Sequence, residues 1–189
     1  MAYSDELPAQ KDWYNGIEFR SKLESKTAQA LDNIGIPYVY EPDGYKLSNG
    51  LWYRPDFWLP NVQQFIECKG VMSSTDSAKI VGLVEDTNHP VLVISYDKAM
   101  FVTRFWNNPE NNVTAYDKYI ALGKCAICDE KFFYNGADTY ACPACLAHDG
   151  DHYLGTLANI ESGQQLFEYG QEVAADNPLY QEIANSFNN

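Results

Sequence analysis

The stretch that decides the fold runs from Arg54 to Gly70 and reads Arg-Pro-Asp-Phe-Trp-Leu-Pro-Asn-Val-Gln-Gln-Phe-Ile-Glu-Cys-Lys-Gly. Its pattern predicts two short strands joined by a turn at Pro60. Glu67 and Lys69 are two residues apart, so on a strand they point to the same face, and Asp56 can face Glu67 across the hairpin. Two carboxylates and one ammonium group on rigid strands predict a divalent-metal site with a basic assistant.

Helices and strands alternate on both sides of this hairpin, which predicts an α/β fold with the order α-β-β-β-α-β. Pro55 inside the first strand indicates an edge position or a bulge that aims Asp56. An apolar run such as 91–95 is typical of a strand buried on both faces. The expected elements are a helix over 17–34, strands over 38–41, 45–48, 51–59 and 64–69, a helix over 74–86 capped by Ser74 or Thr75, and a strand over 91–95.

Composition narrows the class of protein. The chain has 189 residues, of which 46% are hydrophobic, and a formal net charge of −13, which argues against binding duplex DNA through a basic surface alone. After Lys131 the sequence holds eight acids and no Lys or Arg, so the amino-terminal part is the better candidate to contact nucleic acid. We find neither a membrane-length apolar run nor a signal-peptide pattern, and we expect a cytoplasmic protein with no membrane partner.

Four of the five cysteines form two Cys-x-x-Cys knuckles separated by 13 residues. Each knuckle presents two thiolates on one tight turn, and this spacing predicts a tetrahedral structural zinc site far more strongly than an iron–sulfur cluster. His148 and His152 are read as surface residues. The ribbon itself could recognise nucleic acid, or it could be a structural clip or a protein-docking module. The predicted ligands are Cys125, Cys128, Cys142 and Cys145.

We therefore expect a first domain over 1–120, a zinc ribbon over 121–155 and an acidic tail over 156–189. Leu166, Phe167, Leu179, Tyr180 and Ile183 recur at helical spacings and predict one or two amphipathic helices in that tail. Such helices could pack on the first domain or hold a protein partner.

The residues of the first domain suit phosphodiester hydrolysis, which needs a nucleophilic water and a stabilised leaving group. Mg²⁺ or Mn²⁺ held by Asp56, Glu67 and the backbone carbonyl of Cys68 would supply both. Lys69 can orient or help deprotonate the water and stabilise phosphate charge. Glu24 can hold a coordinated water or a second ion, although it could equally be a solvated helix acid paired with Arg20.

Four sequence motifs follow one another along the first domain. They are Arg20-Ser-Lys-Leu-Glu24, Leu31 to Pro42 (Leu-Asp-Asn-Ile-Gly-Ile-Pro-Tyr-Val-Tyr-Glu-Pro), Tyr53-Arg-Pro-Asp-Phe-Trp-Leu-Pro60 and Ile66-Glu-Cys-Lys-Gly70. Together they resemble the PD-(D/E)xK nuclease superfamily with the restriction-endonuclease-like fold, in particular small nucleases of phage and prophage type. The resemblance covers residues 17–95.

The resemblance implies a mixed sheet flanked by helices, dependence on a divalent metal, and DNA as substrate. By position, Asp56, Glu67 and Lys69 inherit the catalytic roles and Glu24 the helix acid. Arg20 and Glu41 recur in such sequences and are expected to support the site. Cys68 stands where the family usually has an aliphatic residue, and its side chain is expected to face the core.

The leading hypothesis is a metal-dependent endonuclease acting on DNA, which would act in the host cytoplasm if a phage encodes it. A protein of another class is the first alternative: a nuclease-like adaptor that docks a protein partner through its acidic tail. An RNA-cleaving nuclease is the second.

Overall fold

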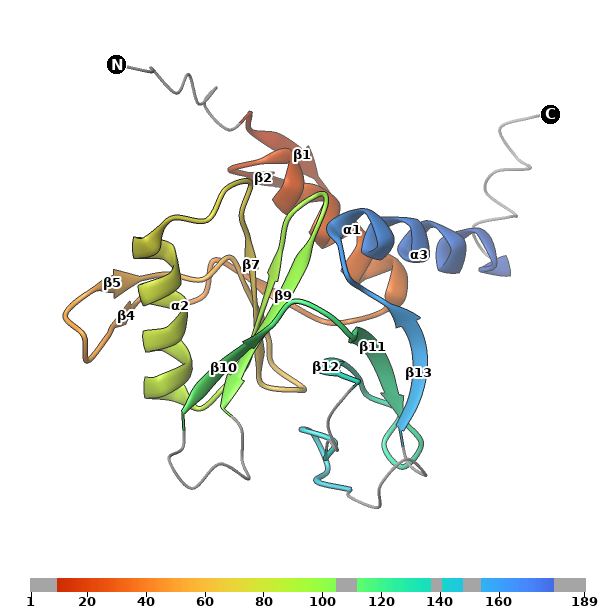
Figure 1. The fold of residues 1–189 in the computed structure, drawn as a ribbon. Coiled ribbons are helices and arrows are strands. Elements are labelled where there is room, and N and C mark those ends of the chain that lie inside the picture. Colours follow the sequence, from red (N-terminus) through yellow and green to blue (C-terminus); the bar gives the residue numbers. More distant parts are fainter. Residues whose placement is uncertain (1–9, 105–111, 137–140, 148–153, 179–189) are drawn as a thin grey trace.

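A mixed six-stranded sheet forms the centre of the protein, whose computed structural model describes residues 10–104, 112–136, 141–147 and 154–178. The strand order is β10-β9-β8-β7-β6-β3, and only the β7–β8 pair is parallel. Figure 1 shows the sheet between helix α2 on one face and helices α1 and α3 on the other. The strands of this sheet are β3 (Val39–Tyr40), β6 (Phe57–Leu59), β7 (Gln64–Cys68), β8 (Val91–Ile94), β9 (Ala99–Arg104) and β10 (Val113–Tyr116).

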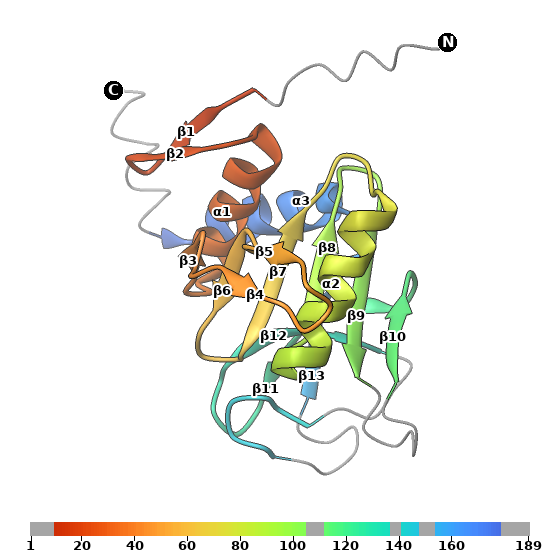
Figure 2. The same ribbon diagram turned by 90° about the vertical axis from the view of Figure 1, so that its left-hand side faces the viewer.

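The path through this sheet follows the predicted order of helix, three antiparallel strands, helix and parallel strand. Helix α1 (Lys22–Ile34) precedes β3, β6 and β7, and α2 (Ser74–Thr87) carries the chain to β8 beside β7. A crossover helix is the usual way to bring two neighbouring strands parallel. The short hairpin of β4 (Tyr45–Lys46) and β5 (Trp52–Tyr53) lies between β3 and β6 in the chain and next to α2 in space (Figure 2). The fold is thus α/β with a mixed sheet.

Two expected boundaries were wrong. The first helix begins at Lys22 and not at Ile17, because residues 12–19 form a hairpin of β1 (Asp12–Tyr14) and β2 (Ile17–Phe19). Asn15 and Gly16 form its turn with φ of 49° and 79°, and the Ser21 hydroxyl then caps the helix by accepting the Glu24 N–H. The expected strand over 51–59 is two strands, β5 and β6, separated at residues 54–56 around Pro55.

The cap of the second helix also differs from the expected one. Ser73, and not Ser74 or Thr75, is the N-cap of α2, and with Asp76 it forms a reciprocal capping box. Helix α2 ends at Asn88, whose φ of 58° is the left-handed conformation common at helix ends.

A second sheet packs against the α1 face of the central sheet. It has the order β12-β11-β13, with β11 (Ile120–Cys125), β12 (Lys131–Asn135) and β13 (Leu154–Asn159). The expected helical tail from residue 156 therefore begins as a strand, because β13 pairs with β11. Helix α3 (Gly163–Ala175) follows and contains the predicted Leu166 and Phe167, both buried. The predicted Leu179, Tyr180 and Ile183 lie outside the described residues.

Helix α3 crosses α1 at close range, and Gly170 makes this possible. A Cβ atom at Gly170 would lie 3.0 Å from the Cα of Ala30, so a larger residue would push the helices apart. The α1 side of the central sheet, α3 and the β11–β13 sheet share one hydrophobic core, whereas α2 and β4–β5 cover a separate core on the other face. None of the described helices has the length and apolarity needed to cross a membrane.

Gln64 joins the two sheets through a pair of buried hydrogen bonds. Its Nε2 donates to the Phe133 carbonyl over 2.7 Å, and the Phe133 N–H donates to its Oε1 over 3.0 Å. The amide side chain therefore satisfies the backbone of the outer strand β12, which has β11 as its only strand partner among the described residues.

We expect Gln64→Leu to lower the free energy of unfolding by about 2–4 kcal/mol, because both Phe133 backbone groups lose their buried partner at about 1–3 kcal/mol each. Urea denaturation measures the change. The matched control is Gln29→Leu on the exposed side of α1, which should stay within about 0.5 kcal/mol of wild type. Equal stability of the two variants would mean that the sheets are held together without Gln64.

Candidate metal and phosphate site

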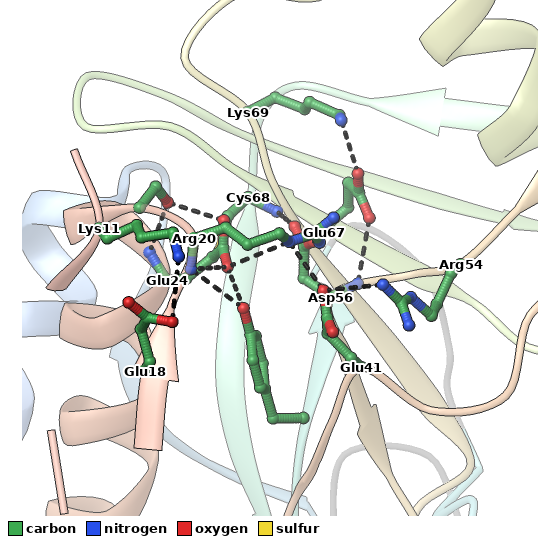
Figure 3. Close-up of polar contacts among 12 residues, drawn as sticks. Lys11, Glu18, Arg20, Glu24, Glu41, Arg54, Asp56, Glu67, Cys68 and Lys69 are labelled. Carbon is green, nitrogen blue, oxygen red and sulfur yellow. Dashed lines mark hydrogen bonds and ion pairs between the residues drawn. The ribbon is translucent and has the colours of Figure 1, made fainter. Parts of the chain in front are cut away.

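The predicted site residues gather at one end of the central sheet, where β7 ends and α1 and α2 begin (Figures 1 and 3). Asp56 directly precedes β6, Glu67 lies in β7 and Lys69 follows it. Arg20 lies between β2 and α1, and Glu24 is in the first turn of α1. Glu67 and Glu24 thus lie in regular elements, and the other three residues lie within two positions of an end of such an element.

Asp56 is held from three sides. Its side chain is 5% exposed, its Oδ1 accepts from Arg20 Nη2 over 2.6 Å, and its Oδ2 accepts from the backbone N–H of Cys68 over 2.7 Å. Its own N–H donates to Glu67 Oε2 over 3.3 Å. The break in the strand at Pro55 therefore turns Asp56 toward the end of β7, where its backbone N–H bonds the Glu67 carboxylate. That the two carboxylates share one ion stays a prediction.

Glu67 and Lys69 form an ion pair on the same side of β7. Lys69 Nζ lies 2.8 Å from Glu67 Oε1 and 3.5 Å from Asp76 Oδ1 in α2. Glu67 is 2% exposed, whereas Lys69 is 28% exposed and its ammonium reaches solvent. Burial lowers the pKa of Lys69, but the charges of Glu67 and Asp76 outweigh it and raise that pKa. Lys69 is therefore a charged donor at neutral pH.

Glu24 is tied to its own helix end and to β3. Its Oε1 accepts from the Ser21 hydroxyl over 2.8 Å, and its Oε2 accepts from the Tyr40 hydroxyl over 2.6 Å. The Arg20 guanidinium is 3.8 Å from Glu24 Oε2, so the ion pair expected as the alternative role is present as a long contact. Glu24 is nevertheless buried, not solvated.

Arg20 connects the acids of the site. Its Nε lies 2.8 Å from Glu41 Oε1, while its Nη2 bonds Asp56. Arg54 reaches the same Glu41 oxygen at 3.2 Å. Arg20 and Arg54 are about half exposed, 52% and 51%, so each also has donors facing solvent. Two guanidinium groups and one ammonium group therefore surround the carboxylates (Figure 3).

The electrostatics of the pair suit a divalent cation. Burial and the neighbouring Glu67 carboxylate raise the pKa of Asp56 to about 8, although the Cys68 N–H and Arg20 oppose the rise. Two ionised carboxylates at this depth repel each other unless a further positive charge lies between them. The atoms that Asp56 and Glu67 offer as ligands are carboxylate oxygens, the type that Mg²⁺ and Mn²⁺ prefer in proteins.

The pKa of Asp56 predicts how stability depends on pH when no divalent cation is added. Between pH 4 and pH 8 the unfolded chain ionises this group while the folded protein keeps its proton, so the Asp56 contribution to stability falls as pH rises. Asp56→Asn removes that loss. At pH 8 we expect its melting temperature to exceed that of wild type by about 2–4 °C for each 1 kcal/mol recovered.

Thermal unfolding of zinc-loaded protein, dialysed into buffer without Mg²⁺, measures this difference at pH 5 and pH 8. The excess stability of the variant should shrink toward pH 5. Asp43→Asn, an exposed acid in the turn before β4, is the control and should show no such trend. A variant less stable than wild type at pH 8 would contradict the predicted repulsion.

The four knuckle cysteines converge at the end of β11. Their Sγ atoms all lie within 4.8 Å of one another, with 3.8 Å between Cys125 and Cys145 and 3.6 Å between Cys128 and Cys142. Among the described residues they are the one group of three or more His, Cys, Asp or Glu side chains gathered this closely. The predicted cluster is therefore present and could hold a structural metal ion, whereas Asp56 and Glu67 offer two ligands and not a preformed cage.

Backbone N–H groups favour the thiolate form of Cys125, whereas the pKa values of Cys128 and Cys142 are raised. Although burial raises the pKa of Cys125, the N–H groups of Cys128 and Ile127 outweigh it and lower that pKa to about 7. Thiolate is the form that binds a metal, so the turn prepares Cys125 for ligation.

Three further residues belong to the site and were missed in the sequence. Tyr40 bonds Glu24, Asp76 faces Lys69, and Tyr53 lies buried near Glu67. Only Asp76 carried a readable signal, because Ser73-Ser-Thr-Asp76 has the spacing of a capping box. The sequence pattern around Tyr40 and Tyr53 does not distinguish them from ordinary aromatic residues of the core.

Comparisons of the chain with models of protein families, with curated proteins and with solved structures gave no match. A function for the site must therefore be argued from its geometry and from the motifs that carry the resemblance.

Proposed function

We propose that this protein is a Mg²⁺- or Mn²⁺-dependent nuclease that hydrolyses phosphodiester bonds in DNA. The observation that carries the proposal is the placement of Asp56 and Glu67 at the end of β7, where the Asp56 backbone N–H donates to Glu67 Oε2 over 3.3 Å and Lys69 Nζ lies 2.8 Å from Glu67 Oε1. The order of α1, β3, β6, β7, α2 and β8 supports it, because it is the order that the resemblance to PD-(D/E)xK nucleases implies.

The residues divide the work between holding a cation and handling phosphate charge. Asp56 and Glu67 would hold the divalent cation, with the Cys68 carbonyl as a further oxygen ligand. When bound, such a cation polarises the phosphate, makes water more acidic and offsets the charge of the transition state. Arg20 Nη2 and the Cys68 N–H fix the two oxygens of the Asp56 carboxylate at the end of β7.

Lys69 contacts the reacting groups in this mechanism. Its ammonium is partly exposed beside Glu67, so it can donate to a nonbridging phosphate oxygen and orient the attacking water. Asp76 on the other side of Nζ limits where that ammonium can go. Arg20 and Arg54, each half exposed, are placed to contact neighbouring phosphates.

The four-cysteine cluster is proposed to hold Zn²⁺. Four thiolates gathered on two turns suit tetrahedral Zn²⁺, and a segment this short has little core of its own. Lys131 Nζ donates to the Ile34 carbonyl over 2.7 Å, which ties the ribbon to the end of α1. These contacts support a role of the zinc in stability.

The experiment that tests the function is cleavage of supercoiled, linear, single-stranded and branched DNA, and of RNA, in Mg²⁺ or Mn²⁺. We expect DNA products that depend on the added cation. Cleavage of RNA alone would favour the ribonuclease alternative. No cleavage of any substrate, with capture of a protein partner that requires α3, would favour the adaptor.

A further inference from the structure

The hydroxyl of Tyr53 is the most unusual polar atom near the proposed site. Tyr53 ends β5, the residue is 7% exposed, and its hydroxyl oxygen makes no hydrogen bond of standard geometry among the described residues, although Glu67 lies close enough to interact with it. A buried hydroxyl without a partner costs about 1–3 kcal/mol. Phenylalanine would fill the same space without that cost, so the hydroxyl calls for a partner that the site supplies in its working state.

The surroundings determine which partner that is. The charged groups that act on the hydroxyl are carboxylates, Glu67 most strongly and then Asp56 and Asp76. Ionised carboxylates only accept hydrogen bonds, so a protonated phenol can act there only as a donor.

Among these carboxylates, Glu67 is the one left short of a good donor. Asp56 has Arg20 and the Cys68 N–H at 2.6 and 2.7 Å, and Asp76 is bonded by its own cap residue Ser73 at 2.6 Å. Within the described part of the chain, Glu67 Oε2 accepts its one hydrogen bond of standard geometry from the Asp56 N–H at 3.3 Å, whereas its Oε1 faces Lys69.

We propose that Tyr53 is a positioning residue that donates its hydroxyl hydrogen bond to Glu67 and so fixes this carboxylate for the divalent cation. The proposal rests on the proposed function, because it assigns Glu67 as a ligand. The proposal also assigns a role to the β4–β5 hairpin. Through Tyr53, the hairpin would position the Glu67 carboxylate from the α2 face of the sheet, opposite to Arg20.

Tyr53→Phe tests the proposal because it removes one oxygen atom and keeps the ring. Mn²⁺ is the probe, titrated into zinc-loaded protein and followed by the loss of its free-ion paramagnetic resonance signal. We expect the variant to bind Mn²⁺ about 10-fold or more weakly, as is found when an outer partner of a metal ligand is removed. Its melting temperature without Mn²⁺ should equal or exceed that of wild type, since no native hydrogen bond is lost.

Tyr45→Phe is the matched control, because Tyr45 pairs with Tyr53 across the β4–β5 hairpin and packs edge-on against Phe65 at 5.7 Å. It should bind Mn²⁺ like wild type. Wild-type affinity in Tyr53→Phe would overturn the proposal, and so would an equal loss in both variants, which would indicate a general effect of the hairpin.

The two proposals fail in different ways. Wild type that cuts DNA while Tyr53→Phe binds Mn²⁺ normally would refute the role of Tyr53 and leave the nuclease intact. Wild type that binds Mn²⁺ with help from Tyr53 but cuts no nucleic acid would refute the nuclease alone. A wild-type protein that binds no Mn²⁺ beside its zinc would overturn both.

Discussion

Asp56→Asn is expected to lower the rate of DNA cleavage in Mg²⁺ by about 10³-fold or more. When catalytic residues act together, removing one of them loses nearly as much rate as removing all of them. The amide keeps the shape of the side chain and can still accept from the Cys68 N–H, but it removes the charge that faces Arg20 and that would hold the cation. Lys69→Ala should lose about 10²–10³-fold, the usual cost of one donor to a developing charge.

Quantitative cleavage of the DNA form cut best by wild type measures both losses. Asp43→Asn and Lys46→Ala are matched controls, an exposed acid and an exposed lysine beside or within β4, and both should cut like wild type. Residual activity equal to wild type in Asp56→Asn and Lys69→Ala would mean that the cleavage arises at another site or from a contaminant.

Loss of Cys142, a proposed zinc ligand, is expected to have the largest effect on stability. Structural zinc contributes about 10–16 kcal/mol of binding free energy in small zinc domains, which is comparable to the whole stability of an ordinary protein. Cys142 is fully buried in the core shared by the ribbon and α1, so Cys142→Ser should release the metal and lower the free energy of unfolding by more than about 3 kcal/mol.

Elemental analysis and chemical denaturation of the same preparations check this expectation. Cys68→Ser is the control, because Cys68 is buried in β7 away from the cluster, near Thr27 Oγ1 at 3.5 Å. It should retain one zinc ion per chain. Wild type isolated without zinc, or Cys142→Ser with wild-type stability, would contradict a structural metal at this cluster.

The sequence was sufficient for the features that depend on neighbouring residues. Pro55 before Asp56, and Glu67 and Lys69 two apart, predict the geometry of the β6–β7 end because strand periodicity is local. The cysteine pairs likewise predict their cluster, because each tight turn fixes two sulfur atoms. The long apolar run of β8 and the helical spacing of α2 were readable for the same reason.

Features that depend on distant pairing were not readable. Strands β1, β2 and β13 are short or carry no clear alternation, and each is stabilised by its partner, not by local preference. The bonds of Gln64 to Phe133 span 69 residues, and those of Arg20 to Asp56 span 36, so no sequence window contains both ends. Tyr53 could not be separated from a core aromatic until the missing partner of its hydroxyl was visible.

The two proposed metal sites differ in how the fold arranges their ligands. The cysteine cluster is complete in the described residues, as expected of a metal that stabilises the fold. Asp56 and Glu67 instead make contacts with Arg20 and Lys69 that leave their charges balanced in part. A catalytic metal ion would then contact the same carboxylates as the Arg20 guanidinium and the Lys69 ammonium. A bound phosphate could replace part of the carboxylate contacts of these two side chains.

Anomalous diffraction from crystals soaked in Mn²⁺ tests the central claim most directly. We predict a manganese peak in contact with both Asp56 and Glu67 in wild type, and its loss in Asp56→Asn, while the zinc peak at the four cysteines persists in both. A wild-type map with zinc in place but no manganese between these two carboxylates would contradict the proposed metal site, and with it the proposed nuclease.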